Sequence, residues 1–383
     1  MIKKSLGPLC FTVIVLLFVH FIFELNFTFI NSLKSVENEV EMKDIYFSKI
    51  QNNQNKTLDT NIVLVDIDTF KRPQILNLLN KINTYQPKVI GVDVLFKEDE
   101  EPGSTVFSDY VVYAESHPFT VFACVDSRDV ISHSFFVLKG SKAKEGLVNF
   151  GNAEEGKPIR SILNHTEKSE NLKSFAFNIA ELYNPSFSAL NKIKEKDKID
   201  ITYNSVLFPN EYLANEIIND STRVYLPKLK GKIVLVGAIN DENDKHKIPN
   251  TSIGNRQQIY TKESGLKIHA TAIAMLLNNT IVSEPSGFWK TVFTILIFLF
   301  FFYLLFFLFE KYEFYFKLTG RLVLLFGGII FLLLYVLLMK SGIEIEIGYW
   351  FFMIIIIYEM LEVYHPIMHL IRKGWKSITK KQQ

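Results

Sequence analysis

Cysteine is nearly absent from this sequence. Its 383 residues include two cysteines, Cys10 within an apolar run near the start and Cys124 much further along the chain. Small exported domains that depend on disulfides for stability are dense in cysteine. The sequence therefore argues against a disulfide-stabilised scaffold, and a folded domain in this chain has to rely on its own hydrophobic core.

A strong imbalance of charge is also missing. The chain contains 42 Lys and Arg against 40 Asp and Glu, which gives a formal net charge of +2. Proteins that bind nucleic acids carry a marked basic excess or a basic face. These totals give no signal for nucleic acid, and we expect no nucleic-acid partner.

Long apolar runs, by contrast, are frequent. Hydrophobic residues make up 48% of the chain and the mean hydropathy is +0.15, which is high for a soluble protein. Four apolar stretches cover residues 6–23, 291–309, 322–339 and 345–364. An α-helix needs about 20 apolar residues to cross the ~30 Å hydrocarbon core of a bilayer. The sequence therefore predicts four transmembrane α-helices, one N-terminal and three C-terminal.

The first and last of these stretches differ from the middle two. Lys3 and Lys4 precede the first stretch and no small-residue cleavage site follows it, which is typical of an uncleaved signal anchor. In the last stretch Glu346, Glu359 and Glu362 shorten the uncharged centre. Whether that stretch crosses the membrane completely is left open.

The basic residues predict the orientation of the helices. With four crossings, one side of the membrane receives Lys3, Lys4, Lys311, Lys317, Arg321, Arg372, Lys373, Lys376, Lys380 and Lys381. The short loop on the other side has Lys340 but also Glu344 and Glu346. Positively charged loops stay on the cytoplasmic side, so we expect cytoplasmic termini and an extracytoplasmic body. The expected domains are a signal anchor (1–30), an α/β body (31–286), three transmembrane helices (287–365) and a short basic cytoplasmic tail (366–383).

The body is organised around residues 61–96. An apolar, β-branched run at 62–68 is followed by a helical pattern at 75–82 and by a second apolar run at 89–96. This order is typical of a parallel βαβ unit that is covered on both faces. A second unit has a strand at 232–238, a polar loop at 239–263 and a helix at 266–279, and between the units we expect helices at 108–116 and 171–183 and strands at 120–125, 134–138 and 146–150. The predicted fold class is α/β with a largely parallel sheet.

Ionisable residues occur where these strands end. Asp66, Asp68 and Asp93 lie at or near the ends of the first two strands, Asp244 is in the polar loop and His269 is near the start of the following helix. Open α/β sheets bind ligands beyond the carboxyl ends of their strands. If both units share one parallel sheet, these five residues converge there, and we take them as candidate ligand-binding residues.

Each candidate also has a structural interpretation. Asp68 precedes a helix, where a carboxylate accepts backbone N–H groups, and a histidine at a helix start, such as His269, often serves the neighbouring loop. Asp66 and Asp93 lie inside apolar runs, and a buried carboxylate requires a partner. Ligand binding and mutual satisfaction of these polar groups both stay open at this point.

An enzymatic interpretation starts from Asp66-Ile67-Asp68-Thr69. This run is similar to the first motif of haloacid-dehalogenase-type phosphatases, in which one Asp attacks phosphorus, the other acts as acid and base, and Mg²⁺ screens the charge. The threonine comes one place early, Ala238 stands where a metal-binding Asp is needed, and no lysine motif lies between. We therefore expect no enzyme, metal or cofactor, and keep an extracytoplasmic Mg²⁺-dependent phosphohydrolase using Asp66 and Asp68 as the alternative.

A family resemblance is carried by segments spread along the chain. They are residues 61–68 and 87–96, Gly146-Leu147-Val148-Asn149-Phe150 with Ile159-Arg160, and residues 231–238 with Asp244, Pro249 and Gly265-Leu266-Lys267-Ile268-His269-Ala270. In these segments the chain resembles CHASE2, a family of extracytoplasmic sensory domains, over most of residues 37–283. It departs from the family pattern where Phe70-Lys71-Arg72-Pro73 replaces a Trp-Pro-Trp-x-Arg segment and where Ile248 replaces a threonine.

The resemblance implies a sensor in the bacterial cytoplasmic membrane, with one helix before the domain and three after it. Such a protein detects an extracytoplasmic small-molecule ligand or a state of the cell envelope. Family members commonly continue into a cytoplasmic output domain, whereas this chain stops soon after its last helix. We therefore expect a separate membrane or cytoplasmic signalling partner. A homo-oligomer, and a structural membrane component with a degenerate sensor fold, stay open.

Overall fold

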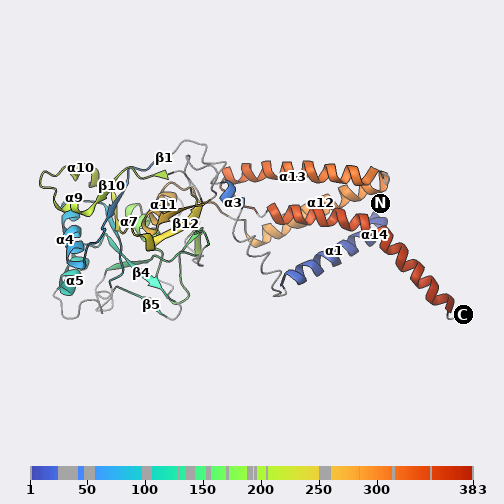
Figure 1. Cartoon of the computed structure of the whole chain (residues 1–383), viewed down its shortest axis with the longest axis horizontal. Helices are drawn as coiled ribbons and strands as arrows, with labels where there is room; N and C mark the ends of the chain where they lie inside the picture. Colours follow the sequence, from blue (N-terminus) through green and yellow to red (C-terminus); the bar gives the residue numbers. More distant parts are fainter. Residues whose placement is uncertain are drawn as a thin grey trace. The chain divides into compact units, whose positions relative to one another are not determined.

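The computed structural model of the protein describes residues 2–24, 42–46, 57–96, 106–127, 130–134, 143–151, 157–169, 172–187, 193, 196–203, 206–249, 260–283, 285–312, 315–345 and 347–381. The chain forms two compact units. One consists of Lys43–Ile281, and the other of Met1–Met42 together with Val282–Gln383. The first unit contains a sheet with helices, and the second is built from long helices (Figure 1).

A mostly parallel sheet lies at the centre of the first unit. Its strands follow the order β10 (Glu211–Leu213), β2 (Ile62–Asp66), β11 (Ile233–Gly237), β3 (Val89–Asp93), β4 (Thr120–Asp126) and β5 (Ile131–Ser132), and β6 (Lys144–Leu147) also pairs with β4. Every pair is parallel except β4 with β5. All residues of β2 and β11 are buried, as their continuous apolar runs require. The predicted α/β class with a largely parallel sheet is confirmed.

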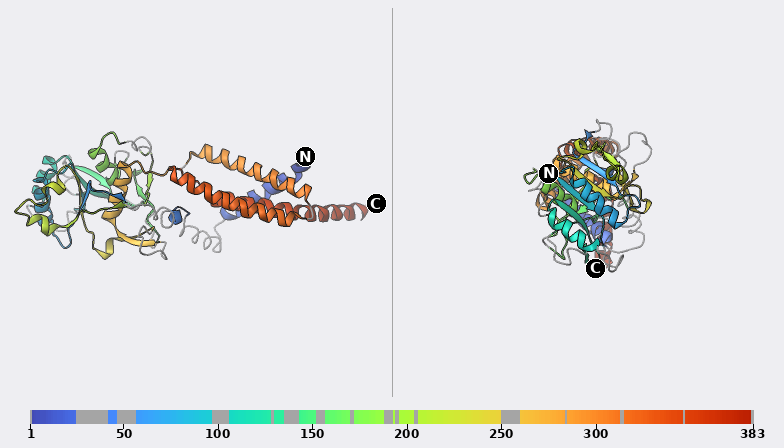
Figure 2. Two further views of the ribbon diagram at one scale, coloured as in Figure 1. Left: turned by 90° about the horizontal axis from the view of Figure 1, so that it is seen from above. Right: turned by 90° about the vertical axis from the view of Figure 1, so that its left-hand side faces the viewer.

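Helices cover both faces of this sheet (Figures 1 and 2). One face packs against α4 (Arg72–Asn83), α5 (Val106–Ser116), α9 (Ala214–Ile218) and Leu229 of α10 (Leu226–Leu229), which share one hydrophobic core with side chains of β2, β3 and β11. The other face packs against α7 (Phe175–Tyr183) and α11 (Gly265–Leu277). A side chain at Gly91 of β3 would collide with Ile179 and Phe175, so this glycine allows α7 to approach the sheet closely.

Shorter elements complete the first unit. They are α3 (Met42–Ile45), the 3₁₀ helix η4 (Glu242–Asp244), and the strand pairs β1 (Thr57–Leu58) with β9 (Val206–Leu207), β7 (Ser161–Leu163) with β8 (Lys198–Asp200), and β12 (Lys245–Pro249) with β13 (Tyr260–Ser264). The prediction of a single long loop between β11 and α11 is therefore wrong, because β12 and β13 form an antiparallel pair there. The strand expected at 134–138 lies almost entirely outside the described residues.

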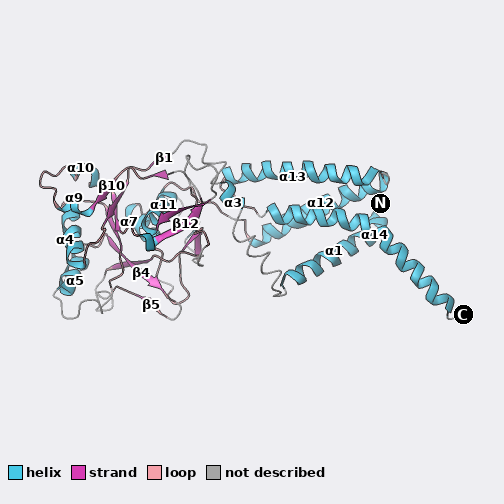
Figure 3. Ribbon diagram, viewed as in Figure 1, coloured by secondary structure: helices cyan, strands magenta, loops and turns pink. Residues whose placement is uncertain are grey.

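The second unit contains α1 (Ile2–Glu24), α12 (Gly287–Lys311), α13 (Phe316–Lys340) and α14 (Ile347–Lys381). Figure 3 draws these segments as helices, with the strands confined to the first unit. By length and composition, α12, α13 and the Ile347–Tyr364 part of α14 are able to cross a membrane. This confirms three long apolar helices at the C-terminal end. Helix α1 contains a shorter apolar stretch, Ser5–Phe18, and its crossing of the membrane stays a prediction.

Helix α14 packs more extensively than any other described helix of this second unit, against α1, α12 and α13. The ring of Tyr358 occupies the space that a side chain at Gly320 of α13 would need. The indole nitrogen of Trp350 donates a hydrogen bond to Thr294 Oγ1 of α12, at 3.0 Å. Small residues and interhelical hydrogen bonds are the usual means by which helices associate in a bilayer.

Candidate functional site

The strand register brings two of the candidate aspartates to the same sheet edge. Gly237, the last residue of β11, pairs with Asp66 at the end of β2 and with Asp93 at the end of β3. A Cβ atom on Gly237 would lie 3.2 Å from the Cβ of Asp93 and 3.0 Å from Leu266 Cδ1. The absence of a side chain at Gly237 thus leaves room for Asp93 and Leu266 beside β11. Asp66 and Asp93 lie on the two strands that flank Gly237.

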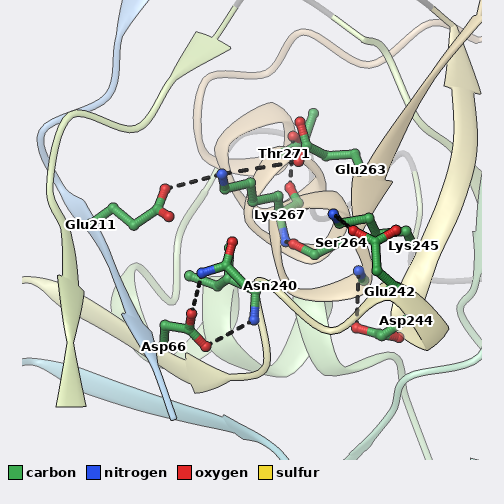
Figure 4. Close-up of polar contacts among 12 residues, drawn as sticks. Asp66, Glu211, Asn240, Glu242, Asp244, Lys245, Glu263, Ser264, Lys267 and Thr271 are labelled. Carbon is green, nitrogen blue, oxygen red and sulfur yellow. Dashed lines mark hydrogen bonds and ion pairs between the residues drawn. The ribbon is translucent and has the colours of Figure 1, made fainter. Parts of the chain in front are cut away.

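Asp66 holds two loops in place. Its buried carboxylate accepts hydrogen bonds from the backbone N–H of Asp68 (3.1 Å), the backbone N–H of Ile239 (3.1 Å) and the side-chain amide of Asn240 (2.6 Å). Figure 4 shows the contacts of Asp66 with the loop that contains Asn240. Three donors satisfy most of a carboxylate's capacity, so this geometry favours a structural role for Asp66 over that of a phosphoryl acceptor.

Asp68 has a different environment. It is exposed, and its backbone is in the left-handed region with φ of 46°, a conformation that asparagine and aspartate tolerate better than most residues. Asp68 therefore contributes to the turn after β2. The paired use of Asp66 and Asp68 in phosphoryl transfer finds no support in this arrangement.

Asp244 is the last residue of η4, and its side chain contacts the first residue of α11. Its Oδ2 accepts a hydrogen bond from the backbone N–H of Gly265 (3.2 Å), and its Oδ1 lies 3.3 Å from Nε2 of His246. A Cβ on Gly265 would lie 3.0 Å from both carboxylate oxygens, so the absence of a side chain there is what lets Asp244 reach the helix. The partial positive charge at a helix N-terminus favours a carboxylate in this place.

His269 follows Gly265 by one helical turn. Side chains four residues apart share a helix face and lean towards the N-terminus, so the imidazole of His269 is directed to the side on which Asp244 sits. The ring is 1% exposed, stacks on Phe150 with centroids 5.2 Å apart, and meets the edge of Phe175 at 5.4 Å. Burial is the main cause that lowers the pKa of His269 to about 4, and it is therefore neutral at neutral pH.

The two ring nitrogens of His269 are in different states. The backbone carbonyl of Val148 interacts with the imidazole and raises its pKa, and because a carbonyl only accepts, we assign the ring proton to the nitrogen that faces it. The buried Nδ1 has no hydrogen-bond partner among the residues that the structure describes. In a neutral imidazole with one N–H, this Nδ1 is a bare acceptor, which costs free energy while it stays unpaired.

Asp93 is also short of partners. Among the described residues, none donates a hydrogen bond or forms an ion pair to its carboxylate, although it is partly buried. Burial, followed by the nearby charge of Asp244, raises the pKa of Asp93 from 3.8 to about 7, and His246 acts in the opposite direction. Asp93 therefore keeps its proton to a higher pH than an ordinary aspartate does.

These residues form one group, which we call the sheet-edge cluster: Asp93, Asp244, His246 and His269. The charge of Asp244 acts on Asp93 and on His269, as does that of His246, and Phe150 packs against both histidine rings. Three of the five predicted site residues thus come together, Asp66 adjoins them across Gly237, and Asp68 stands apart. The roles of His246 and Phe150 were missed, because each becomes recognisable only once β12 and the segment after β6 are placed beside α11.

The lysines around this group are already paired. Lys267 lies 3.0 Å from Glu211 and 4.0 Å from Glu263, and Lys245 pairs with Glu242 (Figure 4). They therefore do not neutralise Asp93 or Asp244. In the described part of the chain, no group of three His, Cys, Asp or Glu side chains is arranged to hold a metal ion.

The fold and the helices together define a class of protein. An α/β domain with a mostly parallel sheet is joined in one chain to three helices that are able to span a membrane, which places the protein in the class of membrane-anchored α/β proteins. The sequence model of the CHASE2 domain matches residues 12–308, which is most of the chain, and the protein belongs to the CHASE2 domain family. No curated protein and no solved structure matches the chain.

Proposed function

We propose that this protein senses an extracytoplasmic small-molecule ligand at the sheet-edge cluster and passes the signal through its membrane helices to a separate partner. The supporting observation is that two polar groups of the cluster, the carboxylate of Asp93 and Nδ1 of His269, have no hydrogen-bond partner in the described structure. Groups left unpaired at the carboxyl edge of a parallel sheet are costly for stability and suited to a ligand.

The direction of signalling is supported by the basic residues. Lysines and arginines gather at the α12–α13 connection and in the tail after Tyr364, whereas the α13–α14 connection carries Glu344 and Glu346 beside Lys340. By the positive-inside rule the α/β domain is outside and both termini are cytoplasmic, provided that α1 crosses the membrane. A ligand at the cluster is then on one side and the partner on the other.

The chain connectivity offers a route for transmission. Helix α11 carries His269 and ends at Leu277, and a short connection leads to Gly287 at the start of α12. A ligand that binds one arrangement of α11 better than another shifts the equilibrium towards it by the difference in binding free energy. This shift is the signal that we assign to α12 and the helices packed with it.

The proposal is tested by the thermal unfolding of the whole protein in detergent, with and without a low-molecular-mass extract of its native environment. A ligand that binds only the folded state raises the melting temperature. We expect the parent protein to be stabilised and Asp244→Ala and His269→Ala to fold without gaining stability from the extract. The control is Asp59→Ala, which alters a carboxylate before the amino end of β2 and should respond like the parent. If no extract stabilises the parent and both site variants are badly destabilised, the cluster is structural and the proposal is wrong.

A further inference from the structure

Among the described residues, most of the polar atoms that the sheet-edge cluster leaves unpaired are acceptors once Asp93 is ionised. They are the carboxylate of Asp93, the remaining lone pairs of Asp244 and the bare Nδ1 of His269. Asp244 has used one oxygen for the Gly265 N–H and the other for His246, and a carboxylate offers about four acceptor positions in total. An occupant of this site must therefore supply hydrogen-bond donors.

The charge of the cluster points in the same direction. Asp93 and Asp244 repel each other, as the raised pKa of Asp93 reflects, and His269 is neutral. The nearby described lysines, Lys245 and Lys267, are bound to glutamates. An anionic ligand would add acceptors and negative charge to a place that already has an excess of both, so it does not fit.

We propose, on the basis that this edge is the sensory site, that the cluster binds the ammonium group of a primary amine, with one N–H directed to each of Asp93, Asp244 and His269 Nδ1. An alkylammonium group has three N–H donors and no acceptor, which matches three acceptors one to one. Its charge relieves the repulsion between the two carboxylates. Phe150, which packs between the rings of His246 and His269, offers an aromatic face that favours a cation or its alkyl chain.

The test is isothermal titration calorimetry on the whole protein in detergent at pH 8 and constant ionic strength, with four probes. The probes are n-butylammonium chloride, tetramethylammonium chloride, n-butanol and sodium butyrate. Tetramethylammonium has the positive charge without an N–H group, n-butanol has the alkyl chain without a charge, and butyrate has a shorter alkyl chain with a negative charge. We expect n-butylammonium to bind, tetramethylammonium to bind at least about 10-fold more weakly because it has no N–H, and the other two not to bind.

Two variants locate the site. Asp93→Asn keeps the shape of the side chain and removes its charge, and His269→Phe keeps an aromatic ring and removes the Nδ1 acceptor. Each should weaken n-butylammonium binding by roughly 10- to 100-fold, whereas Asp59→Asn, the same change of carboxylate to amide before β2, should bind like the parent. Circular dichroism of each variant checks that it is folded.

Several results would overturn the inference. Equal affinity for tetramethylammonium, binding of butyrate, or undiminished n-butylammonium binding by Asp93→Asn and His269→Phe each contradict it. If no amine binds while the native extract still stabilises the parent but not His269→Ala, the ligand class is wrong and the sensory function stands. If neither the amine nor the extract has an effect, both proposals fail.

Discussion

Two single residues of the sheet-edge cluster, Asp93 and His269, give opposite contributions to the pH dependence of stability. The folded-state pKa of Asp93 is raised from 3.8 to about 7, so between these values the folded protein keeps a proton that the unfolded chain has lost. Stability from this group is therefore lost as the pH rises towards 7. The pKa of His269 is lowered from 6.5 to about 4, so the unfolded chain binds the extra proton, and stability is lost as the pH falls from 6.5 towards 4.

This opposition predicts how two variants depart from the parent. Asp93→Asn should gain stability relative to the parent as the pH rises from 4 to 8, by on the order of 1–3 kcal/mol once the partial exposure of Asp93 is allowed for. His269→Phe should gain relative to the parent as the pH falls below 6.5. Differential scanning calorimetry of the whole protein across this pH range measures both differences. Parallel profiles for the parent and Asp93→Asn would show that Asp93 has no altered ionisation.

The residue scale also shows what sequence alone could reveal. Asp66 and Asp93 were recognisable because a carboxylate inside an apolar run needs an explanation, and both occupy the expected sheet edge. Their different states depend on which loop folds over which strand: three donors hold Asp66, and no donor in the described part of the chain holds Asp93. No local pattern encodes that choice. The sequence could therefore identify both aspartates as candidates but could not predict which of them has hydrogen-bond donors.

At the scale of elements, α3 is joined to the α/β domain by a buried ion pair. Asp44 of α3 accepts hydrogen bonds from Arg160, with Nη2 to Oδ2 at 2.6 Å, and from the hydroxyl of Tyr260 at 3.1 Å. Both charged side chains are at most 5% exposed. In the sequence α3 is the first described element after α1. This contact therefore attaches the segment that follows α1 to the α/β domain.

Breaking the pair should be costly. Removing one partner of a buried ion pair leaves an uncompensated charge and destabilises a protein by about 3–5 kcal/mol. We therefore expect Arg160→Met to lower the melting temperature of the whole protein strongly, and Asp44→Leu with Arg160→Met to recover part of the loss. Lys245→Met, which breaks the exposed pair with Glu242, is the control and should change stability by less than about 1 kcal/mol. Equal effects of Arg160→Met and Lys245→Met would contradict a structural role for this pair.

The elements themselves were predictable to different degrees. Long apolar runs specify β2, β3 and β11, because a strand buried on both faces leaves no room for polar residues. The helix expected at 171–183 begins only at Phe175, since the side chain of Ser174 accepts the N–H of Phe177 and caps the helix there. The strands β12 and β13 are as long as β2 but consist mostly of polar residues, so no apolar run marks them in the sequence. The partnership of Asp44 with Arg160 spans more than a hundred residues, which no local signal can report.

At the scale of the whole molecule, the chain combines a unit built around a parallel sheet with a unit of long apolar helices. Each unit follows from its own composition: β-branched runs with polar loops in one, and uncharged runs of membrane-spanning length in the other. The proposed function requires the α/β unit to lie outside the cytoplasm, where it meets the ligand, while the helical unit crosses the bilayer towards the signalling partner. The sidedness of the chain is thus the central claim of this account.

Reporter fusions measure that sidedness most directly. Two reporters are fused in turn after Lys56, Ser286, Lys317 and Gln383. Alkaline phosphatase is active only outside the cytoplasm, and a green fluorescent protein fluoresces only when it folds inside the cytoplasm. We predict phosphatase activity after Lys56 and Ser286, and fluorescence after Lys317 and Gln383, because the basic residues fall beside the latter two. Fluorescence without phosphatase activity at Ser286 would place the α/β domain in the cytoplasm and contradict an extracytoplasmic sensor.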